Sequence, residues 1–515
     1  MGAARGSADQ AGLREWIGLA VLALPALLVS IDVSVMILAL PHIGTGLGAD
    51  SVQQLWIMDI YGFMLSGCLV TMGSLGDRIG RRKLLMIGGA AFSLASLLAA
   101  FSPNAGMLIA ARALLGIAGA TVSPSTLALI GNMFRDPKQR SLAIGIWFAC
   151  SMGGMALGPV VGGAMLERFW WGSVFLLGLP VMILLLATAP FLLPEYRRPD
   201  AARIDLPSVG LSLGAILPVI LGLKEIAKGG VQAAPVLAIA AGLAIGWLFW
   251  SRQRKLADPL IDLRLFGSPG FRAALGGMFG VTLTGAIMLF LAQYLQFVQG
   301  LSPLHAGLYM LPGIAASMAG MLISPLLARR IRPARLIAGG LAAACAGCLL
   351  FTQAGPESGI PAIVAGYVLF SLGASPLPGL SSDLVVGSAP PDQAGSAASL
   401  LQTGSEFAYA LGIASLGSLA TFVYRGQVAP MIPAAVPEAA SQASRDSLIG
   451  AAAAAEGLPD SLRSALMDGA KEAFASSMHA VAVICGAIML LVAVLVSARL
   501  RHLRPIGHRV SVETE

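Results

Sequence analysis

Charged residues are scarce in this sequence. Asp, Glu, Lys and Arg make up 11% of its 515 residues, whereas a soluble globular domain has about 25%. Hydrophobic residues reach 57% and the mean hydropathy is +0.81. This composition excludes an ordinary soluble domain and indicates a polytopic membrane protein.

Residues that carry enzyme, metal or redox chemistry are also few. The five histidines fall in loops or at helix ends, and there is no nucleotide-binding loop, metal-ligand cluster or nucleophile–base set. The five cysteines all lie in apolar segments, and Cys345 and Cys348 have no His or acidic neighbour, so we interpret them as small packing residues. We therefore expect no enzyme, no metal and no cofactor. If the protein moves a solute across the membrane against its gradient, an ion gradient must supply the energy.

Long apolar runs are what the sequence has instead. A helix of about 20 residues crosses the hydrocarbon core of a membrane, and by this measure we expect fourteen spans. Their approximate limits are 15–41, 52–72, 83–101, 106–130, 141–166, 171–193, 207–226, 234–251, 271–298, 303–328, 333–352, 360–384, 394–423 and 477–498.

The positions of Lys and Arg predict the orientation. Most of the 33 basic residues fall in alternate connections, which places those connections and both termini in the cytoplasm. The net charge of +7 reflects mainly this bias, so it argues against nucleic acid as a partner. The first apolar run is too long for a cleavable signal peptide.

A dense charged block at 73–83, Gly-Ser-Leu-Gly-Asp-Arg-Ile-Gly-Arg-Arg-Lys, separates the second and third spans. Its glycines are expected to allow a tight reversal, and Asp77 to cap or neutralise nearby helix ends. The alternative is an ordinary positive-inside loop. The residues that define the block are Gly73, Gly76, Asp77, Arg78, Gly80, Arg81 and Arg82.

Four charged residues lie well inside apolar runs, away from the ends of the runs. Asp32 is in the first span, Asp59 in the second and Arg112 in the fourth, and at 1.5 Å per residue all three lie in the outer half of the membrane. A charge at the bilayer centre costs about 2.5–3.5 kcal/mol, so we expect Arg112 to pair with Asp32 or Asp59; the alternative is that it reaches the outer headgroups. Glu406, in the thirteenth span, is expected near mid-membrane.

Other polar and aromatic residues share these spans. Gln402, Glu406 and Tyr409 are spaced i, i+4, i+7 and so share one helix face. Lys224 lies near the outer end of the seventh span and receives no role. The cavity candidates are Trp56, Tyr61, Met36, Gln402, Tyr409, Gln293 and Phe297.

The fifth span contains glycines at every fourth position. Gly154, Gly158 and Gly162 therefore line one face and let another helix approach closely, and Pro159 is expected to bend the helix. Gly163 completes the pattern G-x-x-x-G-P-x-x-G-G. Far along the chain, residues 424–476 are expected to form an outer hairpin of two short helices broken at Gly457-Leu-Pro459; the alternative is a disordered loop.

These features together resemble the major facilitator superfamily, and within it the fourteen-helix, QacA-like drug/proton antiporters that export quaternary ammonium compounds. The block at 73–83 resembles the superfamily's signature loop, and the glycine pattern of the fifth span resembles its antiporter motif. The resemblance implies proton coupling, with Asp32, Asp59 and Glu406 as the acids that bind protons or cationic substrates and Arg112 as a supporting charge. Some relatives have a further acid where this chain has Ala410.

The expected fold is an all-α polytopic membrane protein with two six-helix bundles and two inserted helices. The expected parts are a cytoplasmic tail at 1–14, a bundle at 15–193, a linker with helices 7 and 8 at 194–270, a second bundle at 271–498 that includes the hairpin 424–476, and a cytoplasmic tail at 499–515. After the tenth span, the basic segment from Arg329 to Arg335 occupies the place of the signature loop but keeps neither its Asp nor its Gly. We interpret it as a weak copy of that loop, in line with internal repeats of six helices.

The sequence thus predicts a proton-coupled multidrug exporter of lipophilic organic cations (quaternary ammonium compounds, dyes and biocides), which would confer antimicrobial resistance. Its partners would be these small molecules, protons and the lipid bilayer, and we expect a monomer in the bacterial cytoplasmic (inner) membrane. One alternative is an exporter of a single physiological metabolite or lipid on the same scaffold. A membrane-embedded sensor or enzyme is disfavoured, because no catalytic cluster or soluble output domain is present.

Overall fold

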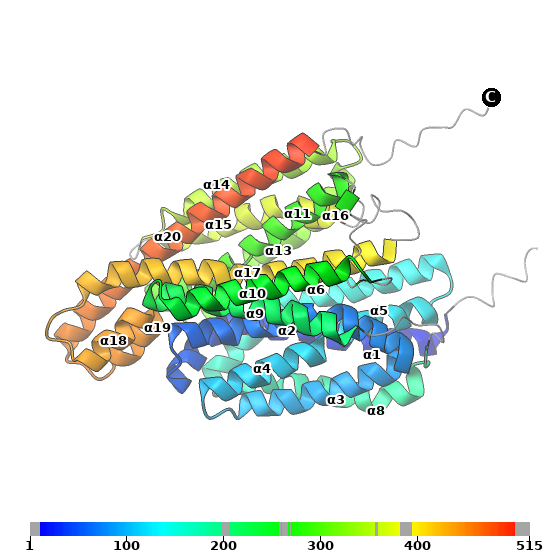
Figure 1. The fold of residues 1–515 in the computed structure, drawn as a ribbon, viewed down its shortest axis with the longest axis horizontal. Coiled ribbons are helices and arrows are strands. Elements are labelled where there is room, and N and C mark those ends of the chain that lie inside the picture. The colour runs from blue at the N-terminus through cyan, green and yellow to red at the C-terminus, as the bar shows by residue number, and fades with distance from the viewer. Residues whose placement is uncertain are drawn as a thin grey trace, which may run out of the picture. The chain divides into compact units, whose positions relative to one another are not determined.

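The computed structural model describes residues 11–197, 205–256, 259, 266–267, 269–355, 359–381 and 394–499. Every regular element within these ranges is a helix (Figure 1). The predicted cytoplasmic tails at 1–14 and 499–515 lie almost entirely outside the described residues.

The contacts divide the chain into two compact units, described here one at a time. The first unit comprises residues 1–260, 301–308 and 435–463. Its helices are α1 (Leu13–Leu47), α2 (Ser51–Ile79), α3 (Arg81–Ala100), α4 (Ala105–Gly119), α5 (Val122–Met133), α6 (Pro137–Arg168), α7 (Ser173–Leu176), α8 (Gly178–Leu192), α9 (Leu206–Gly229), α10 (Ala233–Gln253), α18 (Glu438–Asp446) and α19 (Leu448–Ala455), with the first turn of α13 (Pro303–Leu327).

The second unit comprises residues 261–300, 309–434 and 464–515. It holds α11 (Pro269–Thr284), α12 (Ile287–Gln293), the π-helix η2 (Tyr294–Val298), the rest of α13, α14 (Pro333–Phe351), α15 (Gly359–Ala374), α16 (Pro376–Ser381), α17 (Ala394–Val428), the 3₁₀ turn η5 (Ala429–Met431) and most of α20 (Asp460–Arg499).

Polar side chains fix several helix starts. Asp50 accepts a hydrogen bond from the Gln53 backbone N–H at 2.8 Å, and the Gln53 side chain accepts one from the Asp50 N–H at 3.1 Å. This capping box satisfies donors that the first turn of α2 would leave unpaired. Asn104 caps α4 in the same way, through the Met107 N–H at 2.9 Å.

The number of membrane spans agrees with the sequence. Within the described ranges, 13 helices are long and apolar enough to cross a membrane, and α2 brings the number to 14 when its two parts, bent by 49°, count as one span. Large apolar side chains such as Leu94, Leu243 and Trp247 are exposed on the helix surfaces, as expected where lipid replaces water as solvent.

Several boundaries differ from the prediction. α2 continues through most of the charged block and ends only at Ile79, and the span expected at 360–384 is divided into α15 and α16. The segment 424–476 does contain two short helices, but both, α18 and α19, precede the break at Gly457-Leu-Pro459, and the residues after it begin α20. The second half of the predicted hairpin is missing because these residues belong to α20, a single helix of 40 residues that extends well beyond the apolar stretch of the last predicted span.

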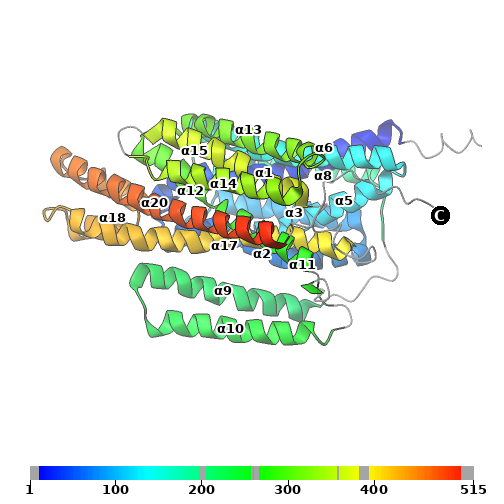
Figure 2. The same ribbon diagram turned by 90° about the horizontal axis from the view of Figure 1, so that it is seen from above.

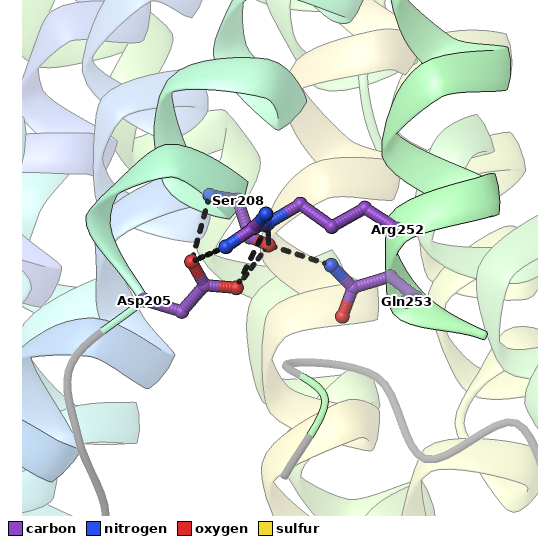
Figure 3. A network of polar contacts seen from close by, with 4 residues as sticks. All are labelled: Asp205, Ser208, Arg252 and Gln253. Atoms are coloured by element: carbon purple, nitrogen blue, oxygen red, sulfur yellow. Dashed lines mark hydrogen bonds and ion pairs between the residues drawn. The ribbon is translucent and has the colours of Figure 1, made fainter. Parts of the chain in front are cut away.

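Helices α9 and α10 form a hairpin within the first unit. They lie side by side (Figure 2), joined by a short connection, and α9 also packs against α2. At the other end of the hairpin, Arg252 Nη2 lies 2.8 Å from Asp205 Oδ1, and Gln253 Nε2 donates to Ser208 Oγ at 2.8 Å (Figure 3). We call Asp205, Ser208, Arg252 and Gln253 the Asp205 network. The proposal that this hairpin is an insertion between two bundles stays a prediction.

Candidate functional site

Arg112 links three helices of the first unit. Its Nη1 lies 2.7 Å from Asp32 Oδ2, its Nε donates to the Ile57 carbonyl at 3.1 Å, and its guanidinium carbon lies 4.6 Å from the centre of the Tyr61 ring. The Arg112 side chain is 1% exposed and that of Asp32 is 9% exposed. Arg112 therefore pairs with Asp32 inside the protein and does not reach the headgroups.

Asp59 has a different partner, Lys224 of α9. Lys224 Nζ lies 2.7 Å from Asp59 Oδ2, and both side chains are 0% exposed. The same ammonium lies 3.8 Å from the centre of the Trp56 ring, close enough for a cation–π interaction. Lys224 is the main residue that the sequence reasoning missed. The signal was present, because a lysine inside an apolar span needs a buried acid.

Lys224 and Arg112 contact different faces of α2. Trp56 and Asp59 are three residues apart and face α9, whereas Ile57 and Tyr61 are four residues apart and face α4. The close approach of α4 depends on Gly116, where an added Cβ would lie 2.4 Å from the Tyr61 carbonyl oxygen. Asp32 and Asp59, the two predicted membrane carboxylates of this unit, are thus each already paired with a protein cation.

Glu406 lies on α17 of the second unit and is half-buried. Gln402 Nε2, one turn earlier, donates to its Oε1 at 3.2 Å, as the i, i+4 spacing predicts. Within the described part of the chain, no Lys, Arg or His pairs with this carboxylate. Glu406 thus differs from Asp32 and Asp59, each of which has a basic partner.

The remaining cavity candidates have varied surroundings. Met36 is 1% exposed within the first unit, so it is a core residue. In the second unit the ring of Tyr409 lies beside Gly285, Gln293 is buried and Phe297 is half-buried at a π-helix. Such π-helical turns often occur at functional sites.

The charged block forms a compact junction rather than a free loop. Gly73 and Gly76 are inside α2, and only Gly80 makes the reversal, with φ of 110°. The expectation that several glycines form the turn is therefore wrong. Asp77 pairs with Arg81 at 2.8 Å and does not cap a helix. Gly76 leaves room for the Arg81 side chain, because a Cβ there would lie 2.9 Å from Arg81 Cδ.

Glu195, which the sequence reasoning did not single out, completes this junction. Its carboxylate accepts hydrogen bonds from the backbone N–H groups of Arg82 at 3.1 Å and Lys83 at 3.2 Å, and it pairs with the Arg82 side chain at 3.5 Å. A carboxylate at this place satisfies the free donors at the start of α3. Arg78 is exposed.

The glycines of the predicted antiporter motif lie where α6 meets α1. A Cβ on Gly154 would lie 2.3 Å from the Leu27 carbonyl oxygen, and Cβ atoms on Gly158 and Gly162 would collide with Ser34 and Val35. The predicted close helix approach is confirmed. Gly163 contacts the backbone of Leu304, and the carbonyl of Pro159, which lies inside α6, faces Gly307.

Among the described residues, no group of three or more His, Cys, Asp or Glu side chains is placed to hold a metal ion. The contacts observed at Asp32, Asp59, Arg112 and Lys224 are charge pairs and cation–π contacts.

Comparisons with known proteins identify the family of the chain. Residues 22–413 match the family model of the Major Facilitator Superfamily. The chain is 42% identical to the multidrug efflux pump LfrA of Mycolicibacterium smegmatis, over 95% of this chain and 97% of that protein. It is 35% identical to the methyl viologen resistance protein SmvA of Salmonella typhimurium, over 93% and 97%.

Solved structures show the same fold at low sequence identity. A bacterial homologue of the human lysosomal transporter Spinster has a TM-score of 0.61 at 17% identity, covering 95% of this chain and 99% of that one. A peptide transporter of the POT type, in complex with sulfate, has a TM-score of 0.61 at 18% identity, covering 94% and 95%.

Proposed function

Because the chain belongs to the Major Facilitator Superfamily and is therefore a multi-pass membrane transporter, we propose that it exports lipophilic organic cations in exchange for protons. The substrates would be quaternary ammonium compounds, dyes and biocides. We further propose that it works as a monomer in the bacterial cytoplasmic membrane, with both termini inside.

The observation that carries this proposal is the carboxylate of Glu406. It lies in a membrane-spanning helix and has Gln402, and no basic side chain, as its partner among the described residues. A lone charge in a membrane is costly, so this carboxylate favours either a bound proton or a bound cation. One site that holds one or the other, and not both, is sufficient for exchange.

Two further findings support the proposal. The relatives that cover nearly the whole chain are named for multidrug efflux and for resistance to methyl viologen. Aromatic side chains also stack on the buried cations Arg112 and Lys224, which is how proteins bind organic cations. In the cycle that we propose, protons from outside expel the cation, and the site then turns inward and exchanges its proton for a new cation.

The test is efflux of ethidium from energised cells that produce Glu406→Gln. We expect a loss of about tenfold or more, equivalent to about 1.4 kcal/mol, because the amide can neither bind a proton nor balance a cation. A matched control is Glu225→Gln, the same change at an exposed acid on α9, which should export like the wild type. A protonophore should abolish wild-type efflux.

Protonophore-insensitive efflux would contradict proton coupling, and full activity of Glu406→Gln would contradict the assigned acid. If the wild type exports a single metabolite and none of several unrelated cations, the metabolite-exporter alternative is correct.

A further inference from the structure

The pair formed by Asp59 and Lys224 has the composition of an organic-cation site. A carboxylate and an indole ring converge on one ammonium, at 2.7 Å from Asp59 Oδ2 and 3.8 Å from the centre of the Trp56 ring. Charge pairing and a cation–π contact are the two interactions by which proteins recognise alkylammonium ligands. Here the ammonium belongs to the protein itself.

We propose that Asp59 and Trp56 form an organic-cation site, which the Lys224 ammonium occupies when no substrate is bound. A cationic substrate must displace this ammonium to bind, so Lys224 acts as a competitor built into the protein. This inference rests on the proposed function, because it concerns how the same substrates are selected.

This pair is buried, unlike a surface salt bridge, and its few contacts favour displacement of Lys224 by a substrate cation. Both side chains are 0% exposed, and apart from Lys224 no group in the described residues hydrogen-bonds to either carboxylate oxygen of Asp59. The ammonium is likewise without a hydrogen-bond acceptor other than Asp59. An ammonium has three donors, so this lysine is held by one charge and one ring and is poorly satisfied, which lowers the cost of exchanging it.

Exchange of Lys224 for a substrate cation would conserve the positive charge beside Asp59. It lies on α9, whose other side packs on α10, and the adjacent acid Glu225 is exposed and not at this pair. An incoming monovalent cation would replace one positive charge by another, so Asp59 would stay neutralised. A neutral or anionic ligand would leave Asp59 buried and unpaired, which typically costs about 3–5 kcal/mol. Lys224 would thus select for cations.

The test is equilibrium binding of ethidium to the purified full chain in lipid nanodiscs at pH 8, followed by fluorescence. Lys224→Met removes the competitor and keeps a side chain of similar length, so we expect the Kd to fall about tenfold. Asp59→Asn/Lys224→Met should lose this gain. Arg252→Gln is a matched control, since it removes a basic side chain from the same hairpin without touching Asp59, and its Kd should equal that of the wild type.

A purely structural role for Lys224 predicts another result. The inference is overturned if Lys224→Met binds ethidium no more tightly than the wild type, or if the gain persists in the double variant. Should Lys224→Met not fold, Lys224→Arg retains the charge; a guanidinium pairs more strongly with a carboxylate, so ethidium should bind several-fold more weakly, and unchanged binding would again refute the competitor. No proton gradient is used, so the result is independent of whether efflux is proton-coupled.

Discussion

At the scale of single residues, the contacts of Arg112 explain why that position needs a guanidinium. Its Nη1 pairs with Asp32, its Nε donates to the Ile57 carbonyl, and its flat face lies over Tyr61. These contacts point in different directions, and a planar group with several fixed donors can make all of them at once. A lysine would have to give up at least one.

We therefore expect Arg112→Lys to lower the free energy of unfolding by about 1.5–3 kcal/mol, the value of a hydrogen bond to a charged group. Thermal or denaturant unfolding of the purified protein in detergent would measure it. Arg168→Lys makes the same change at an exposed site on α6 and should have little effect. Equal losses in the two variants would contradict the role of the Ile57 and Tyr61 contacts.

The sequence predicts the buried acids and Arg112 because a charge in an apolar run is conspicuous. It leaves open which acid Arg112 would choose, since Asp32 and Asp59 lie at similar depths. Only the packing of α9 on α2 decides this, by giving Asp59 its own cation, Lys224. Glu195 was missed because its link to α3 joins residues more than 100 positions apart, a separation that no local pattern reveals.

At the scale of elements, the glycine face of α6 determines how near α1 can lie. We expect Gly154→Ala to destabilise the protein by about 1–3 kcal/mol, as overpacking does, because its Cβ would meet the backbone of Leu27 at 2.3 Å. The neighbouring Gly153 has open space around its Cβ position, so Gly153→Ala should be neutral or slightly stabilising through its better helix propensity.

Melting temperatures of the two alanine variants give the comparison. If the two variants had the same melting temperature, the close contact between α1 and α6 would not depend on a glycine at position 154.

The Asp205 network predicts a pH dependence for the α9–α10 hairpin. Hydrogen bonds from Arg252 and Ser208 hold the pKa of the Asp205 carboxyl below its ordinary value of 3.8. Since the folded pKa is the lower one, the stabilisation is fully present above pH 3.8 and is lost as the pH falls below it. The wild type should therefore melt above Asp205→Asn at pH 7, and this advantage should be smaller at pH 3.

Thermal melts of both proteins at the two pH values would measure this difference. Ser212→Ala, on α9 outside the Asp205 network, is a control that should show the same offset from the wild type at both pH values. An advantage that persists undiminished at pH 3 would mean that the ionised carboxylate is not the stabilising group.

At the scale of the whole molecule, hydrophobicity was sufficient to predict an all-helical membrane protein with fourteen spans, and family membership confirms that fold. Hydrophobicity could not give the ends of the helices. α2 continues to Ile79 because a helix persists through polar residues when its side chains find partners, as Asp77 does with Arg81. The domain boundaries and the roles of the site residues stay predictions.

Because each of the two buried ion pairs has no net charge, the pairs also affect how the protein responds to membrane voltage. Moving one elementary charge across a membrane changes its energy by about 2.3 kcal/mol per 100 mV, but Asp32 with Arg112, and Asp59 with Lys224, each sum to zero. Voltage therefore does no work on either pair while its members travel together. The voltage sensitivity of the proposed transport cycle should therefore come from Glu406 and what it carries, and from any substrate cation that displaces Lys224 from Asp59.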